Sequence, residues 1–322
     1  MFDKVKFIYN LDNYMSDLIK NIDAKLNQIE INDSHKRNYL ITKSKVRSIH
    51  SSLAIEDNSL TLTDVEKISN KKTIVGKKKE IQEVKNAIVL YENVDKFNYK
   101  SENDFLKAYQ IIMKGFEDDD GNYRNHGEGI QKNGKIIYRA PDSILVPSLM
   151  KSLFENLENN NINKLVLASL FHYYFVSIHP FTDGNGRMAR FWSTLILIEY
   201  NNSFEFIPIE EEIYLNQESY YEAIEKSHIN SNANLFIKFM LEIINSSLDK
   251  IIANNNENVL TIEDEIIKLI NYNKYITQNE IATKLNKSLR TIKRYFKKMQ
   301  SDGIIKRVGA DKTGYWSINK KD

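Results

Sequence analysis

The sequence predicts a mostly helical protein with more than one domain, and three observations carry this prediction. Its 322 residues exceed the length at which a single hydrophobic core stops growing. Only 11 glycines and four prolines are present, and the prolines all lie in the middle of the chain, at positions 141, 147, 180 and 208. On both sides of this middle region, apolar residues recur at helical spacing.

Composition excludes several classes of protein. The 45 basic and 43 acidic side chains leave a net charge of +2, so no overall field attracts nucleic acid or a membrane. The lack of cysteine rules out disulfides and thiolate metal sites, and it fits a reducing compartment. Aspartates interrupt the apolar N-terminus, unlike in a signal peptide, and the longest apolar run, 165–178, is too short to span a bilayer. We therefore expect a soluble, cytoplasmic protein without membrane contacts.

The N-terminal region, residues 1–100, is predicted to be helical. One amphipathic helix is expected over about 10–31 and a second over about 35–51. In the first of these helices, apolar residues at spacings of three and four share one face, with lysines and aspartates opposite. They are Leu11, Met15, Leu18, Ile22 and Leu26.

The middle of the chain, residues 101–245, is predicted to form the largest domain. Within 121–141, two short β-prone segments surround Asn133 and Gly134, which predicts a β-hairpin. The apolar run at 165–178 predicts a buried helix.

The C-terminal part of the chain reads as a separate module. Helical periodicity is lost near residue 253, so we predict a linker over 246–259. Three helical segments and two strands around a glycine-bearing turn then follow over 260–322, which is typical of a winged helix-turn-helix.

Basic residues gather locally in this module, between 284 and 312. One hypothesis is DNA binding, with the third helix in a major groove and Lys312 of the wing on the backbone. The alternative is a solvated face that docks on a protein or on the rest of the chain. The candidate contacts on the third helix are Arg290, Lys293, Arg294 and Lys297.

The sequence HPFTDGNGRMAR, residues 179–190, interrupts the apolar middle region. Pro180 cannot continue a helix and drives His179 out of the α region, so the imidazole is presented at a helix end. Gly184 and Gly186 free the backbone to point N–H groups at one spot, beside the positive end of the next helix. This pattern predicts a phosphate-binding site.

The other side chains of this loop fit a nucleotide with magnesium. Arg187 and Arg190 share one helical face and can both reach an anion at the helix start. Asp183 suits the single protein ligand of a Mg²⁺ ion that also binds phosphates. Phe181 is interpreted as a core anchor. His179 titrates near neutral pH and can accept a proton from an attacking hydroxyl.

The loop resembles the signature of Fic-domain proteins, H-P-F-x-[D/E]-G-N-[G/K]-R-x-x-R, at every fixed position. The resemblance covers roughly 45–245, and many similar proteins carry a C-terminal winged helix. Further shared features are GNYR at 121–124, the hairpin with Ala140 and Pro141, VPSLMKSL at 146–153, and Tyr220 with Tyr221. The resemblance implies a helical Fic core with a hairpin flap and, for most members, transfer of AMP from ATP to a Ser, Thr or Tyr hydroxyl of a protein.

The resemblance also implies roles for the charged loop residues. His179 is the general base toward the target hydroxyl. Asp183 holds Mg²⁺ between the α- and β-phosphates of ATP. Arg187 binds the β- and γ-phosphates, and Arg190 assists the γ-phosphate.

Three backbone positions and two tyrosines complete the implied site. Gly184, Asn185 and Gly186 cradle phosphates through N–H groups. Relatives that transfer the γ-phosphate carry Lys at the place of Gly186, so glycine favours adenylyl transfer. Tyr220 and Tyr221 stack near the adenine or, alternatively, are core aromatics.

The implied partners are a target protein and a second copy of the chain. The hairpin at 130–140 resembles the flap that captures the target backbone as an added strand. This mode reads main chain, so the sequence does not name the target. Similar proteins are often dimers, which makes a homodimer an open possibility.

The stretch RSIHSSLAIEDNSLTL, residues 47–62, resembles an inhibitory motif, [S/T]-x-x-x-E-[G/N], through Ser52 and Glu56. The resemblance implies that Glu56 pairs with Arg190, so that ATP binds unproductively and the enzyme is off by default. Asp57 stands where relatives have Gly or Asn, which predicts a differently shaped helix end and weaker inhibition. The alternative is that Glu56 is an ordinary surface acid.

Other functions remain open at this point. In some relatives the glutamate equivalent to Glu56 activates a water that removes AMP from the target. A phosphotransferase is disfavoured by Gly186. A transcription regulator that senses ATP and binds DNA is the rival from another class, although a sensor needs no base such as His179.

Overall fold

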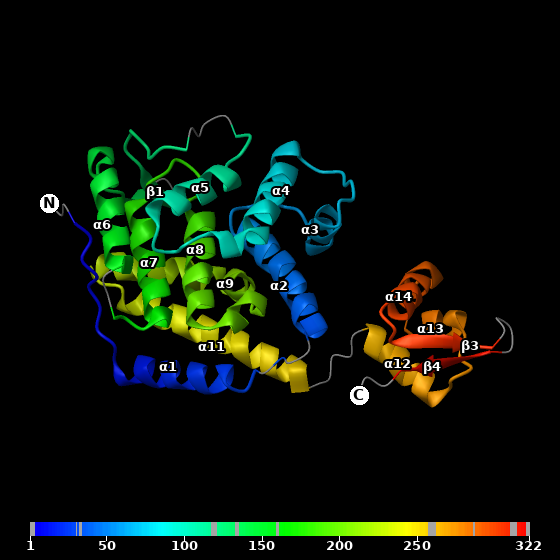
Figure 1. Ribbon diagram of the computed structural model, residues 1–322. Helices are drawn as coiled ribbons and strands as arrows, with labels where there is room; N and C mark the ends of the chain where they lie inside the picture. Colours follow the sequence, from blue (N-terminus) through cyan, green and yellow to red (C-terminus); the bar gives the residue numbers. More distant parts are fainter. Residues whose placement is uncertain are drawn as a thin grey trace. The chain divides into compact units, whose positions relative to one another are not determined.

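The computed structural model describes residues 4–29, 31, 34–116, 121–132, 135–158, 161–256, 262–285, 287–309 and 314–319. Over these residues the chain is mostly helical, with two small antiparallel sheets, as the sequence predicts. It forms two compact units, Met1–Ile252 and Ala253–Asp322, each with its own core (Figure 1). No helix in the described parts of the chain is long and apolar enough to cross a membrane.

The first unit contains eleven α-helices, one hairpin and three 3-10 turns over the residues described. In chain order they are α1 (Asn13–Leu26), α2 (Ser34–Ala54), α3 (Leu62–Ser69), α4 (Lys78–Glu92), η1 (Val94–Lys96), α5 (Glu102–Ile112), β1 (Gly129–Lys132), β2 (Lys135–Arg139), η2 (Ser143–Leu145), α6 (Val146–Glu158), α7 (Lys164–Ile178), α8 (Asn185–Tyr200), η3 (Asn202–Phe206), α9 (Ile209–Leu215), α10 (Gln217–Ile229) and α11 (Asn234–Asn256).

The two predicted N-terminal helices are present. The Asp12 carboxylate caps α1 by accepting the N–H of Met15 at 2.8 Å. The predicted apolar face of α1 is buried from Met15 to Leu26, while Leu11 precedes the helix and is half-buried. α2 continues past the predicted end at residue 51 to Ala54, and this last turn carries residues of the candidate site.

Helix α7 forms the centre of the first unit, with α8 packed along it (Figure 1). It is apolar on all sides because it is buried on nearly all sides, as the run at 165–178 predicts. Phe105 of α5 is fully buried against it, with its ring centroid 5.1 Å from that of Trp192 on α8. This aromatic core supports the loop between α7 and α8.

The predicted hairpin is formed by β1 and β2, with Gly129 opposite Arg139 and Ile130 opposite Tyr138. Asn133 and Gly134, at the predicted turn, lie outside the described residues. Tyr138 ties the hairpin to the core, because its hydroxyl donates to the Ser177 carbonyl at 2.7 Å. Its ring also stacks on His228 of α10 with centroids 3.9 Å apart.

The predicted linker at 246–259 is wrong for residues 246–256, which belong to α11. Leu248 is fully buried, and Ile251 and Ile252 pack against the core. Asparagine in a helix costs under about 1 kcal/mol per residue, so the burial of these apolar side chains outweighs the asparagine-rich composition.

The second unit has the predicted winged-helix order. The Thr277 and Glu280 side chains form a capping box at the start of its second helix. Phe296 and Trp316 meet in its core with ring centroids 4.6 Å apart. The elements are α12 (Ile262–Tyr272), α13 (Gln278–Lys284), α14 (Leu289–Ser301), β3 (Ile305–Val308) and β4 (Tyr315–Ile318).

Candidate active site

The turn after α7 places His179 in the left-handed region, with φ 50° and ψ 61°. The predicted helix end before Pro180 is confirmed, but the residue preceding the proline is left-handed instead of extended. Arg124 holds this strained turn from the neighbouring loop. Its Nε donates to the His179 carbonyl at 2.7 Å, and its backbone N–H donates to the Pro180 carbonyl at 2.8 Å.

Phe181 anchors the loop in the core, as predicted. It is fully buried, and its ring stacks on Tyr109 of α5 with centroids 3.5 Å apart. The Asn185 side chain closes the loop by bonding both backbone groups of Phe181, at 3.1 and 2.7 Å. The amide of Asn185 therefore faces the loop, and only its backbone N–H is offered at the helix start.

The first turn of helix α8 presents backbone N–H groups that have no acceptor among the described residues. Gly184 is its N-cap, with φ 81° and no side-chain cap. Among the described residues, no partner accepts the backbone N–H groups of Asn185, Gly186 and Arg187. These groups and the positive end of the helix are suited to an anion.

Arg187 and Arg190 lie beside this helix start and are almost completely buried. Arg187 Nη2 is 2.8 Å from Asp183 Oδ1, and Nη1 is 3.9 Å from Glu83 Oε1. Within the described chain, Arg187 Nε and Nη1 and Arg190 Nη1 are buried and have no hydrogen-bond partner. Unsatisfied buried donors are unfavourable, so the site is chemically complete only with a further acceptor.

The remaining donors of Arg190 point at the end of α2. Its Nε donates to Ser52 Oγ at 3.0 Å, and Nη2 donates to the Ser52 carbonyl at 2.9 Å and to Glu56 Oε1 at 2.7 Å. This is the pair that the resemblance implies. Burial alone would lower the pKa of Arg190, but the Glu56 carboxylate together with Tyr220 and Tyr221 outweighs burial, and the pKa is raised.

The end of α2 is a Schellman motif. Asp57 is left-handed, with φ 64°. The N–H of Asn58 donates to the Leu53 carbonyl, and the N–H of Asp57 to the Ala54 carbonyl, both at 3.1 Å. The predicted change of helix-end shape is therefore wrong: aspartate adopts the left-handed conformation that glycine or asparagine would take.

Gly186 is helical, which corrects the prediction that it forms part of the turn. A Cβ atom at this position would lie 2.2 Å from Glu56 Oε1 and 3.1 Å from Arg190 Nη1. Glycine therefore leaves the space in which the Glu56 carboxylate rests on the first turn of α8.

Two titratable groups of the loop are shifted. Burial lowers the pKa of His179, which favours the neutral imidazole that a general base needs. Burial alone would raise the pKa of Asp183, but Arg187 and the Gly184 N–H outweigh it and the pKa is lowered. Asp183 thus stays ionised and remains half-exposed toward the site.

The two predicted adenine tyrosines differ. Tyr220 is a core residue whose hydroxyl lies 2.9 Å from Nε2 of the buried His172. Tyr221 is 47% exposed, and its hydroxyl is 3.4 Å from the Ile55 carbonyl, next to Glu56. Only Tyr221 therefore lies on the open side of the site.

Sequence reasoning missed two residues of the site. Arg124 lies in the GNYR segment at 121–124, but nothing in that segment indicates that its guanidinium binds the carbonyl groups after α7. Glu83 on α4 binds the Asn58 amide at 2.8 Å and faces Arg187, but its surroundings in the sequence are ordinary helix surface. Only the fold brings it to the loop.

Comparisons with known proteins agree with this geometry. The model of the Fic/DOC family matches residues 99–197, and that of the winged helix-turn-helix DNA-binding family matches 262–306. The crystal structure of a Fic family protein from Desulfovibrio desulfuricans G20 is 30% identical, covers 99% of both chains and superposes with a TM-score of 0.75.

Curated relatives match shorter stretches. A probable protein adenylyltransferase of Aquifex aeolicus (strain VF5) is 35% identical over 31% of this chain and 30% of its own length. The protein adenylyltransferase Fic of Drosophila mojavensis is 21% identical over 67% of this chain and 43% of its own length. The chain thus spans less than half of each of these relatives.

The fold and the loop define a helical protein that offers an anion site at a helix start beside a histidine. With a full-length relative at 30% identity, the chain belongs to the Fic/DOC family.

Proposed function

We propose that this protein is an adenylyltransferase that moves AMP from ATP to a Ser, Thr or Tyr hydroxyl of a protein, itself included. The observation that carries the proposal is the set of unsatisfied donors at the start of α8, on Arg187, Arg190 and the backbone. Phosphate oxygens supply the missing acceptors, and the names of the curated relatives supply the reaction class.

In this reaction the target hydroxyl oxygen attacks the α-phosphorus and the bond to the β-phosphate oxygen breaks, so pyrophosphate leaves. His179 Nε2 or Nδ1 takes the hydroxyl proton. Its lowered pKa keeps the imidazole neutral and ready to accept that proton. Arg187 and the first N–H groups of α8 bind the phosphates and stabilise the charge of the leaving group.

Magnesium fits the donor set through Asp183, which is ionised, half-exposed and beside the phosphate donors. Mg²⁺ typically takes one or two protein carboxylates and completes its shell with phosphate and water. Within the described residues no group of three or more potential ligands exists, in keeping with a metal that needs the nucleotide. Bound Mg²⁺ neutralises phosphate charge during the transfer.

Glu56 is proposed to restrain this activity. Its carboxylate is held by Arg190 and lies above Gly186, where phosphate oxygens compete for the same donors. ATP binding therefore either displaces Glu56 or leaves the γ-phosphate without Arg190. The hairpin beside the site is proposed to bind the target backbone.

The test is intact mass spectrometry of three proteins incubated with Mg²⁺ and ATP: wild type, Glu56→Gly, and Glu56→Gly/His179→Ala. We expect an added AMP mass in Glu56→Gly, less of it in wild type and none in the double variant. An added phosphate mass instead would establish phosphotransfer. Lack of any increment, with added candidate proteins also unmodified, would favour the ATP-sensing regulator.

DNA binding by the second unit is a further candidate function. Arg290, Lys293, Arg294 and Lys297 are all exposed on α14, while Ile292 and Phe296 face the core. The match of residues 262–306 to a DNA-binding winged-helix family supports DNA contact through this helix. Fluorescence anisotropy with duplex DNA should show binding that weakens steeply with salt and is lost in Arg290→Ala/Arg294→Ala. Salt-independent or absent binding would point to protein docking.

A further inference from the structure

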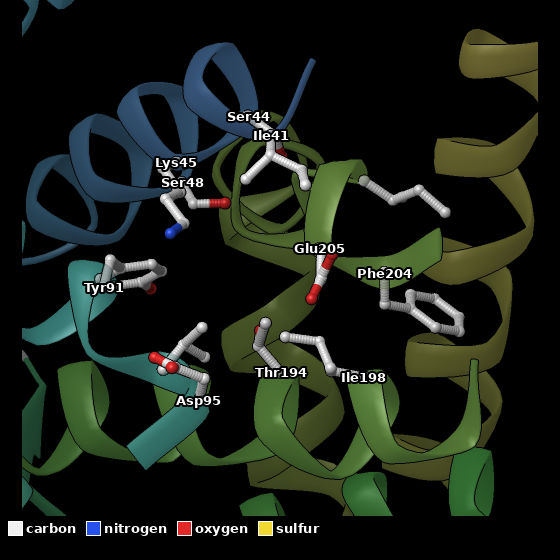
Figure 2. A pocket seen from close by; sticks show the side chains of 12 residues that line it. Ile41, Ser44, Lys45, Ser48, Tyr91, Asp95, Thr194, Ile198, Phe204 and Glu205 are labelled. Atoms are coloured by element: carbon white, nitrogen blue, oxygen red, sulfur yellow. The ribbon is translucent and has the colours of Figure 1, made fainter. Parts of the chain in front are cut away.

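A cavity of about 200 Å³ lies between α2, the end of α4, the start of η1, α8 and η3, within the first unit (Figure 2). None of its lining residues belongs to the 179–190 loop. Pockets for drug-sized ligands enclose roughly 300–1,000 Å³, so this cavity suits a smaller molecule than a nucleotide.

Two opposite charges line this cavity without pairing. Lys45 on α2 is half-buried and Asp95 on η1 is exposed; both line the cavity, and among the described residues neither forms an ion pair. Figure 2 shows Lys45 on the α2 side of the cavity and Asp95 and Thr194 on the opposite side, with Tyr91 between Lys45 and Asp95. Glu205 also lines it, but Arg37 already neutralises that carboxylate at 2.7 Å.

A buried hydroxyl and an apolar wall complete the lining. Ser44 is 5% exposed and places its side chain in the lining. Ile41, Ile198 and Phe204 supply apolar surface on the α2, α8 and η3 sides. A ligand that satisfies this lining carries one anionic group, one cationic group and a small hydrocarbon body.

We propose that the cavity binds a small zwitterion with an apolar body, the chemistry of a hydrophobic α-amino acid. The carboxylate pairs with Lys45, the ammonium group faces Asp95, and the side chain packs on Ile41 and Ile198. Behind the cavity wall, the buried Glu210 carboxyl group accepts hydrogen bonds from the hydroxyl groups of Ser48, Tyr91 and Thr194.

Residues next to the cavity also connect it to the end of α2, the helix that carries Ser52 and leads to Glu56. Ser48 on α2 donates to Glu210 at 2.6 Å, and Thr194 on α8 donates to it at 2.9 Å. Ser48 is one turn before Ser52, and Thr194 is one turn after Arg190. A ligand that contacts both helices therefore favours the docked position of α2, in which Glu56 holds Arg190. The predicted effect of the ligand on activity rests on the proposed adenylyl transfer. The binding of the ligand to the cavity does not depend on that proposal.

Isothermal titration of the 322-residue chain with L-leucine, 4-methylpentanoate and isoamylamine tests the binding. 4-Methylpentanoate is leucine without the ammonium group, and isoamylamine is leucine without the carboxylate. We expect leucine to bind and both analogues to bind about tenfold or more weakly. Lys45→Met should weaken leucine binding by a similar factor, and Ile41→Trp should abolish it by filling the cavity. Lys151→Met, an exposed lysine of α6, is the matched control and should bind like wild type.

Circular dichroism must show native helix content in each variant, so that loss of binding reports on the cavity. If neither leucine nor another hydrophobic amino acid binds at millimolar concentration, or if binding survives both Lys45→Met and Ile41→Trp, the proposal is wrong. If one analogue binds as tightly as leucine, the cavity does not require both charged groups, and the proposal of a zwitterionic ligand is wrong.

Self-modification with Mg²⁺ and ATP supplies the regulatory readout. Leucine should reduce it in wild type and leave Glu56→Gly unchanged. If leucine binds as expected while no variant is modified, the ligand-binding proposal is supported and the adenylyltransferase proposal is wrong.

Discussion

At the scale of single residues, Gly186 decides whether Glu56 can rest on α8. Gly186→Ala should expel the glutamate, because the new Cβ would lie 2.2 Å from its Oε1. We expect self-modification to rise about tenfold or more, since a hydrogen bond to a charged group contributes roughly 1.5–3 kcal/mol. Mass spectrometry measures the rate. The same change in Glu56→Gly should bring no further rise; a rise there as well would mean that alanine acts on the nucleotide instead.

The His179 imidazole sets the pH dependence of the proposed reaction. A base works only when unprotonated, and burial lowers its pKa from the ordinary value of about 6.5. Activity of the Glu56→Gly variant should therefore be flat from neutral pH down past 6.5, and fall only as the pH drops through the lowered pKa. A pH–rate profile, with ATP affinity measured at each pH, checks this. An acid limb above pH 6.5 would argue against a buried neutral base.

The residues of the loop were predictable because their chemistry lies in one continuous segment. His179, Asp183, Arg187 and Arg190 all lie around the start of α8. Arg124 could not be placed in the same way, since its partners, the carbonyls of residues 178 and 179, are far from it in the chain. Short motifs predict local geometry, while long-range backbone contacts depend on the fold.

At the scale of elements, the end of α2 carries a strained residue. An aspartate in the left-handed region is disfavoured relative to glycine by roughly 1 kcal/mol. Asp57→Gly should therefore raise the free energy of unfolding by about that amount, measured by urea titration. Asp57→Ala is the control, because alanine removes the same carboxylate but is as disfavoured as aspartate in the left-handed region. No gain in Asp57→Gly, or an equal gain in both variants, would contradict a local strain at this helix end.

Helices with clear periodicity were predicted well, and helix ends less well. α1 follows its apolar face, but α11 extends through residues 246–256 although its asparagines suggest a linker. The end of a helix is set by what it packs against, and the core that receives Leu248 lies in distant parts of the sequence.

At the scale of the whole molecule, two separate hydrophobic cores predict two separate unfolding events. Truncation after Asn256 removes the winged helix and should leave the transition of the first unit within a few degrees of its place in the full chain. Differential scanning calorimetry of both proteins measures this. A truncated protein that unfolds far earlier, or lacks a cooperative transition, would show that the first core depends on the second.

The left-handed His179 has a consequence for the growing chain. A left-handed residue before a proline is doubly disfavoured in a free peptide. Here Arg124 and the stacked rings of Tyr109 and Phe181 hold the turn, and all of them are synthesised before or within the loop. The donors of α8 follow later. In a growing chain the imidazole of His179, the proposed base, is therefore not held in this position until the central helices have packed.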